Sequence, residues 1–481
     1  MSMVFTLISL LNIGLSLAQT PTISNGEVLK RRFGTDAYGS AQNSLKRDLK
    51  IAIFDNGFAG FKSGSSLLPA SAQLIEGPKN PQKADDFHGL GMAMILWEVM
   101  GKPDTGVKFY LVNADGYTNF KAGVQFAIQN QVDIVLYSQV WTFGGNFDGT
   151  GFIDAQVSQA IRAGITWINA AGNYGSKVSE GSVSEQLTTP RYFTVLKKGA
   201  PVTLTLSWND FDDSSAAWSD QDLDLFVVDE AGKLVGSSEK KQLGHIPGPG
   251  DKNVSAYARE TLTLNGLPEG KYRIEIKNIS NNFTADSRFR VLLESNESVV
   301  FNSATLDREV FPPADHPEVI TVGEDSPVSS RAVLGQSSSK PDFVLPKAIV
   351  DFSDKTHARG SSVAAAIFAG IYAKLKQARP DFNRTLVLTR VENENTDFAI
   401  DPDFKRVNAY EVPADLQKWI TPECEVGFSY AHQTWVLQVP FQPVEFFPEL
   451  RKPQGLEIRR SSGGLSPKLW KTPSPDELKR L

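Results

Sequence analysis

Three short segments of the chain carry an aspartate, a histidine and a serine, in that order. Asp55 follows an apolar run, His88 precedes a glycine, and Ser362 stands in a stretch of small residues. A serine hydroxyl is a weak nucleophile unless an imidazole accepts its proton, and the imidazole needs a carboxylate that fixes its tautomer and stabilises its charged form. The three residue types together predict nucleophilic catalysis by Ser362, with His88 as the base and Asp55 as the residue that orients it.

Apolar runs that alternate with helical patterns must position these groups. The expected strands and helices are, in chain order, strand 49–54, helix 88–99, strand 107–112, helix 119–129, strand 133–140, helix 152–163, strand 165–170, strand 317–323 and helix 362–376. Strands that alternate with helices form parallel βαβ units, which predicts an α/β sheet covered on both faces. Reactive groups in such sheets gather at the carboxyl ends of the strands, and Asp55 directly follows one.

Each of the three segments also has a purely structural interpretation. Asp55 in Asp-Asn-Gly could form a turn, a single histidine is more often structural than catalytic, and the alanines after Ser362 could form a close-packed helix face. Their occurrence together favours catalysis. The free N–H groups at the start of the helix expected from Ser362 would stabilise a developing oxyanion, and a helix that begins at His88 disfavours a protonated imidazole, which suits a resting base.

The order Asp, His, Ser and the three segments resemble those of the subtilisin-like serine proteases. The resemblance covers residues 48–198 and 306–412 and implies a doubly wound, mainly parallel sheet. It points to Ser362 rather than Ser361 as the nucleophile. The chain departs from the usual family residues at four positions, which are Asn56 for Ser or Thr, Leu90 for Thr, Ser361 for Thr and Ala366 for Pro.

The same resemblance implies further site residues. The strand that ends in Ala-Ala-Gly-Asn is similar to the family segment whose asparagine donates to the oxyanion, so Asn173 is the expected donor. Residues 137–140 are expected to pair as an edge strand with an extended peptide, and residues 170–172 to line the opposite pocket wall. The expected substrate-binding residues are Ser138, Gln139, Val140, Ala171 and Gly172.

The pattern changes between residues 199 and 305. Alternating strands are expected at 202–208, 223–228, 260–264, 271–276 and 288–293, separated by turn signals such as Asn265-Gly266. These strands predict an antiparallel β-sandwich inserted into the α/β domain. Residues 413–481 are expected to form a β-rich appendage and a flexible tail.

Composition bounds the function further. Hydrophobic residues make up 41% of the 481 residues and charged residues 22%, which is typical of a globular protein. The net charge of −6 and the dispersed basic residues predict no nucleic acid partner. Residues 1–18 have the shape of a secretory signal peptide, residues 19–47 form a short N-terminal segment, and no later run is long enough to span a membrane. We therefore expect a secreted or periplasmic protein, and a monomer.

Metal and cofactor chemistry is not needed for this mechanism. The only cysteine, Cys424, excludes an intramolecular disulfide and a thiolate metal cluster. Residues 210–213 with Asp220, Asp222 and Asp224 form an acidic stretch that could bind structural Ca²⁺, but no complete calcium-loop spacing is present and a solvated acidic turn is favoured. We expect no cofactor and no metal at the catalytic residues.

The sequence therefore predicts a secreted serine endopeptidase that cleaves proteins through an acyl-enzyme on Ser362. The competing hypothesis is a non-catalytic binding or adhesion protein on a degenerated protease scaffold, motivated by the four departures. An esterase or lipase is disfavoured because the order of the triad differs and no Gly-x-Ser-x-Gly motif surrounds Ser362.

Overall fold

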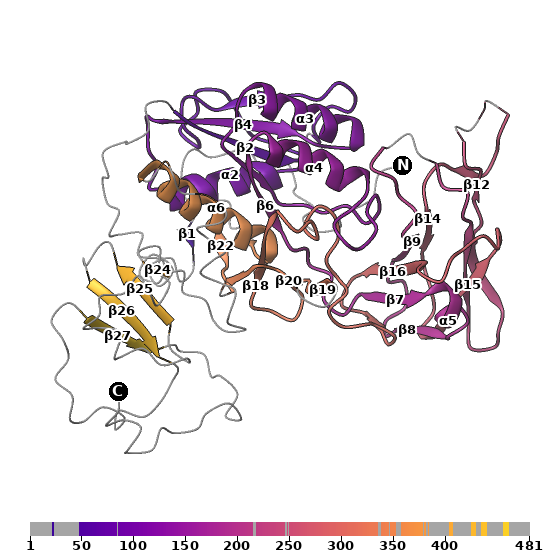
Figure 1. Ribbon diagram of the computed structural model, residues 1–481. Coiled ribbons are helices and arrows are strands. Elements are labelled where there is room, and N and C mark those ends of the chain that lie inside the picture. The colour runs from indigo at the N-terminus through magenta and orange to yellow at the C-terminus, as the bar shows by residue number, and fades with distance from the viewer. Residues whose placement is uncertain are drawn as a thin grey trace, which may run out of the picture. The chain divides into compact units, whose positions relative to one another are not determined.

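The computed structural model describes most of residues 48–378 and a few shorter segments (Figure 1). The gaps within that range are residues 84, 215–217, 246–247, 249, 335–337, 346 and 353–356, and the other described positions are 22–23, 380, 383, 404–406, 425–429, 434–439 and 456–460. The expected signal peptide and most of the expected C-terminal tail lie outside the described residues. The chain divides into two compact units, residues 1–24 with 47–370 and residues 25–46 with 371–481.

A seven-stranded parallel sheet forms the centre of the first unit, with the strand order β21-β18-β6-β5-β2-β4-β3. Its strands are β2 (Leu49–Asp55), β3 (Gln73–Ile75), β4 (Val107–Asn113), β5 (Ile134–Tyr137), β6 (Thr166–Ala170), β18 (Ile320–Glu324) and β21 (Phe343–Leu345). Neighbouring strands pair in parallel throughout. The sequence prediction of a mainly parallel sheet is confirmed.

Helices cover both faces of this sheet (Figure 1). The described helices are α2 (His88–Val99), α3 (Tyr117–Gln129), α4 (Phe152–Arg162), the short α5 (Val183–Gln186) and α6 (Ser361–Ala378). Because successive side chains of a strand point to opposite faces, Phe54 of β2 turns toward α3, where its ring centroid lies 6.2 Å from that of Phe120. On the other face α6 packs closely on α2, since a Cβ atom on Gly370 would lie 2.7 Å from the main-chain oxygen of Leu96.

Two antiparallel sheets lie between β6 and β18 in the chain. One has the order β11-β10-β15-β8-β17 and the other β14-β9-β16-β7. Their strands are β7 (Val178–Ser182), β8 (Arg191–Val195), β9 (Val202–Trp208), β10 (Leu223–Val228), β11 (Leu234–Ser238), β14 (Arg259–Leu264), β15 (Gly270–Asn278), β16 (Arg288–Ser295) and β17 (Val299–Phe301). Their antiparallel pairing begins at Val178, earlier than the expected boundary at residue 199, because β7 pairs with β16 and β8 with β15.

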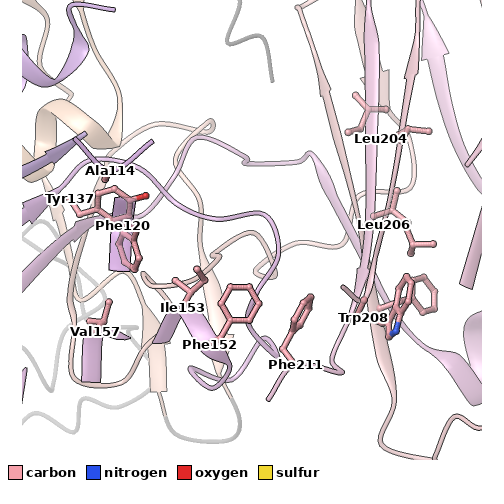
Figure 2. Packing of buried hydrophobic residues seen from close by; sticks show 14 of the residues in the cluster. Ala114, Phe120, Tyr137, Phe152, Ile153, Val157, Leu204, Leu206, Trp208 and Phe211 are labelled. Carbon is pink, nitrogen blue, oxygen red and sulfur yellow. The ribbon is translucent and has the colours of Figure 1, made fainter. Parts of the chain in front are cut away.

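One continuous cluster of buried apolar side chains runs from the parallel sheet into the antiparallel sheets (Figure 2). Phe152 of α4 lies at the junction, with its ring centroid 5.7 Å from that of Phe211 and 5.4 Å from that of Tyr257. Figure 2 shows Tyr137 on one side of this junction and Trp208 on the other. Burial of this shared apolar surface, at about 25 cal/mol per Å², holds the antiparallel sheets against the α/β core.

Short strands complete the described structure. In the first unit they are β1 (Thr22–Ile23), β12 (Lys241–Gln242), β13 (Val254–Ser255), β19 (Ala332–Leu334), β20 (Ser338–Lys340), β22 (Val350–Asp351) and β23 (His357–Ala358). The second unit holds a four-stranded sheet of β24 (Phe404–Arg406), β25 (Glu425–Ser429), β26 (Thr434–Val439) and β27 (Leu456–Arg460). Among the described residues, none of the helices has the length and apolar character needed to cross a membrane.

Candidate active site

The carboxyl ends of four adjacent strands bring the candidate residues together. Strands β2, β5, β6 and β18 are neighbours in the sheet and run in the same direction. Asp55 is the last residue of β2, Ser138 follows β5, Asn173 lies three residues beyond β6, and Glu324 is the last residue of β18. Parallel strands place such residues at one edge of the sheet. Three of these four positions were predicted from the sequence, and Glu324 was not.

Asp55 and His88 form a hydrogen-bonded pair. His88 Nδ1 lies 2.8 Å from Asp55 Oδ2, so the ring donates through Nδ1 and keeps Nε2 for a second partner. The other carboxylate oxygen accepts from the main-chain N–H of Asn56 at 2.8 Å and from Gln139 Nε2 at 3.0 Å. Asp55 is fully buried. A Cβ atom on Gly89 would lie 2.5 Å from Asp55 Cβ, so glycine is required for this close approach of α2 to β2.

The charges around His88 favour its protonated form. Burial lowers the pKa of His88, but the charge of Asp55, the hydrogen bond to it and the charge of Asp86 together raise the pKa to about 9. Asp86 lies close because its Oδ1 accepts the main-chain N–H of His88 at 3.0 Å. The helix N-terminus was expected to keep the imidazole neutral. The two carboxylates outweigh that effect, since each carries a full negative charge whereas the helix end carries only about half a positive charge.

Ser362 lies in the first turn of α6, and its side chain reaches the same edge of the sheet. Its Oγ donates to the main-chain oxygen of Ser138 at 3.0 Å, and among the described residues no hydrogen bond joins it to His88. The next residue, Gln139, holds the carboxylate of Asp55. Two consecutive residues after β5 therefore contact the serine on one side and the aspartate of the Asp–His pair on the other.

The turn before Ser362 is held by the residues that follow β6 and β18. The main-chain N–H of Gly360 donates to Glu324 Oε1 at 3.1 Å, and that of Ser361 donates to Asn173 Oδ1 at 3.0 Å. Since Asn173 accepts through its oxygen, its Nδ2 group remains the donating end. Ser361 is fully buried, and its Oγ accepts the main-chain N–H of Gly172 at 3.1 Å. Its hydroxyl is therefore engaged inside the protein, whereas Ser362 is 8% exposed.

Residues 138–140 differ from the expected edge strand. Strand β5 lies inside the sheet between β2 and β6 and ends at Tyr137, three residues before the expected end at residue 140. Gln139 turns inward, because its main-chain oxygen accepts from Asn169 Nδ2 at 2.9 Å while its side chain binds the aspartate of β2. Val140 is half-buried and packs against the buried cluster of Tyr174, Val178, Leu292 and Phe311.

The expected pocket wall after β6 is buried. Ala171 is fully buried, and its main-chain N–H donates to Val322 at 2.8 Å. Gly172 donates its N–H to Ser361 Oγ and accepts from the N–H of Ser330 at 3.0 Å. These main-chain groups are already paired within the protein.

Acidic side chains also occur away from this site. Asp210 Oδ2 accepts the hydroxyl of Ser219 at 2.6 Å. Across the described part of the chain, no group of three or more His, Cys, Asp and Glu side chains is placed to hold a metal ion. Asp154 and Asp315 are buried together, and none of their carboxylate oxygens has a hydrogen-bond partner among the residues that the structure describes. Burial and the neighbouring carboxylate raise the pKa of Asp154, and burial raises the pKa of Asp315 to about 7.

Comparisons with known proteins give structural likenesses at low identity. Neither the scan against protein-family models nor the search of curated proteins found a match. Among solved structures, the CspB protease of Clostridium perfringens is 15% identical, with a TM-score of 0.48 over 73% of this chain and 88% of that chain. MycP1 with its N-terminal propeptide removed is 12% identical, with a TM-score of 0.32 over 75% and 87%. EpiP, an epidermin leader peptide processing serine protease from Staphylococcus aureus, is 10% identical, with a TM-score of 0.35 over 74% and 71%. Each of these three TM-scores is below 0.5.

Proposed function

We propose that the chain is a subtilisin-like serine endopeptidase in which Ser362 is the nucleophile, His88 the general base and Asp55 the residue that orients the base. The observation that carries this proposal is the hydrogen-bonded Asp55–His88 pair, 2.8 Å apart, at the sheet edge to which Ser362 also reaches. A buried carboxylate that fixes Nδ1 of a histidine prepares Nε2 to accept a proton. Such a pair beside a serine at a helix N-terminus is suited to acyl transfer.

The proposed reaction begins when Ser362 Oγ attacks the carbonyl carbon of a peptide bond. His88 Nε2 accepts the hydroxyl proton as the new C–O bond forms, and the carbonyl electrons move onto oxygen to give a tetrahedral oxyanion. Collapse of this intermediate breaks the C–N bond, and His88 donates the proton to the leaving amine. Water then attacks the acyl-enzyme by the same route and releases the acid.

The oxyanion would be stabilised by two N–H donors. The main-chain N–H of Ser362 lies in the first turn of α6, where a helix offers no internal acceptor. Asn173 Nδ2 is the second donor, because Oδ1 of the same amide is already bound to the turn before Ser362. Neutral donors fixed before the reaction stabilise charge that appears only in the transition state.

We further propose that the two antiparallel sheets form an inserted β-sandwich that binds substrate, partner or surface. The continuous apolar cluster through Phe152 supports a fixed position for it beside the α/β core. The proposed chemistry needs no organic cofactor, and we propose an exported, monomeric enzyme that acts on proteins.

A non-catalytic binding protein on the same scaffold is the second candidate. The observation that favours it is the hydroxyl of Ser362, which donates to Ser138 rather than to His88. Among the four departures from the family, Leu90 and Ala366 are fully buried, and Ser361 accepts the main-chain N–H of Gly172 through its hydroxyl.

Labelling with a fluorophosphonate probe separates the two candidates. We expect folded protein to form a covalent adduct on Ser362 at pH 9, as subtilisin does, and the Ser362→Ala and His88→Ala variants to remain unlabelled. Peptide mapping by mass spectrometry identifies the modified residue. Folded protein that stays unmodified while subtilisin reacts in the same tube would favour the binding protein.

A further inference from the structure

Glu324 is a buried carboxylate at the candidate site that the proposed reaction does not use. It ends the buried strand β18 and is 2% exposed. Its Oε1 accepts the main-chain N–H of Gly360 at 3.1 Å. Its own N–H donates to Ser329 Oγ at 3.0 Å, which fixes the main chain from which the side chain extends. Burying a carboxylate costs free energy unless hydrogen bonds compensate. The hydrogen bond from the turn before α6 supplies part of that compensation.

The turn that receives this bond has little freedom. Gly360 has a φ of +97°, and a Cβ atom there would lie 2.8 Å from Asn173 Oδ1. The turn donates its successive N–H groups to different strands, Gly360 to Glu324 and Ser361 to Asn173. The next N–H along the chain is that of Ser362, which the proposed mechanism directs at the oxyanion.

We infer that Glu324 is a positioning residue that sets the direction of the Ser362 N–H group and side chain by holding the preceding turn through Gly360. This inference rests on the proposed function. Without the carboxylate, the Gly360 N–H would lose its acceptor and the turn would be held only through Ser361, by Asn173 and Gly172, so that a shift of the turn at Gly360 would move both Ser362 Oγ and the oxyanion donors. Small displacements of reacting groups are costly, since a shift of about 1 Å can lower a rate about 100-fold.

The test compares variants that keep or remove the acceptor at constant size. Glu324→Gln retains Oε1, whereas Glu324→Met has a similar length and no acceptor. Glu324→Ala serves if the methionine variant does not fold. Glu309→Ala is the matched control, because Glu309 is 3% exposed and also accepts main-chain N–H groups, from Ser176, Arg308 and Arg331, but not from the turn before α6.

The first readout is the second-order rate constant for fluorophosphonate labelling of Ser362 in folded protein, with kcat and KM on a chromogenic peptide. We expect Glu324→Met to lower the labelling rate and kcat by about 10- to 100-fold with KM nearly unchanged. Glu324→Gln should stay within about threefold of the unsubstituted protein, and Glu309→Ala should lose stability without slower labelling. A folded Glu324→Met protein that labels at the unsubstituted rate would overturn the inference.

The second readout does not depend on catalysis. Hydrogen–deuterium exchange of a peptide that covers residues 358–364 should be faster in Glu324→Met than in Glu324→Gln or Glu309→Ala, because the Gly360 amide loses its acceptor. Unchanged exchange would refute the positioning role even in a protein that never labels. If the protein does not label at Ser362 but exchange is faster in Glu324→Met as expected, the proposed function is contradicted. The hydrogen bond by which Glu324 holds the turn is still supported by that result.

Discussion

The reactivity of Ser362 should rise steeply between pH 7 and pH 9, because His88 must be neutral before it can accept the serine proton. Burial lowers the pKa of His88, but Asp55, through its charge and hydrogen bond, and Asp86, through its charge, raise the pKa to about 9. Below that value most of the histidine is already protonated. The pH profiles of kcat/KM and of the labelling rate should therefore have an acidic midpoint well above pH 6.5, the ordinary pKa of histidine.

The size of the effect follows from this pKa. Two pH units below the pKa, about 1% of His88 is neutral, so the rate should increase about 50-fold between pH 7 and pH 9, where half of His88 is neutral, and about 100-fold in total once it reaches its plateau. This is an upper value, because 36% of the His88 side chain is exposed and water screens the charges of Asp55 and Asp86. The linked stability has the opposite trend. It is fully present below the unfolded pKa near 6.5 and is lost as the pH rises through about 9.

The assay is fluorophosphonate labelling from pH 6 to 10 at constant ionic strength, with circular dichroism at each pH to confirm folding. Asp86→Asn should move the midpoint to lower pH, because it removes one of the charges that raise the pKa of His88. Asp85→Asn is the matched control, since Asp85 is exposed and does not contribute to that shift. A midpoint at or below 6.5, or an Asp86→Asn profile that does not move, would refute the reasoning.

Three other predictions concern single residues. Asn173→Ala should lower kcat by about 100- to 1,000-fold with little change in KM, and a change confined to KM would contradict its role as an oxyanion donor. Ser361→Ala should still label at Ser362 but lower the free energy of unfolding by about 1–3 kcal/mol, because the Gly172 N–H loses its acceptor; denaturant titration measures this, and loss of labelling in folded protein would contradict it. Burial raises the pKa of Asp315 from 3.8 to about 7, so the stability present below 3.8 is lost as the pH rises through about 7. Asp315→Asn should consequently raise the melting temperature more at pH 8 than at pH 5, and an equal effect at both would argue against a raised pKa.

The sequence predicted the strand ends better than the contacts between them. Asp55 and Asn173 could be identified because each follows an apolar strand that can be recognised locally. Strand β7 was missed, because Val178-Ser-Glu-Gly-Ser182 has no alternating apolar pattern and is a strand only through its pairing with β16. A local pattern cannot predict a strand that depends on a partner more than a hundred residues away.

The directions of the side chains at the site could not be predicted from the sequence either. Gln139 was expected among the substrate-binding residues, and the sequence did not predict that its side-chain amide binds Asp55, which it does because a buried carboxylate needs donors and this amide is within reach. Glu324 was visible as a charged residue next to an apolar strand expected to end at residue 323. That its carboxylate is buried against the turn at Gly360 depends on β18 lying beside β6, and this neighbour relation is not encoded in any short segment.

Two features lower the reactivity of Ser362 by different amounts, its hydrogen bond to Ser138 and the protonation of His88. The hydrogen bond from Ser362 to Ser138 is a single neutral bond, and such bonds contribute about 0.5–1.5 kcal/mol, so exchanging it for a bond to His88 lowers the rate by about tenfold at most. Protonation of His88 near neutral pH lowers it by up to about 100-fold. The state of the histidine should therefore control reactivity more than the direction of the serine hydroxyl. A chain that fails to label at pH 7 but labels at pH 9 has an intact triad with a protonated base, whereas failure at both values would point to a serine that cannot reach the histidine.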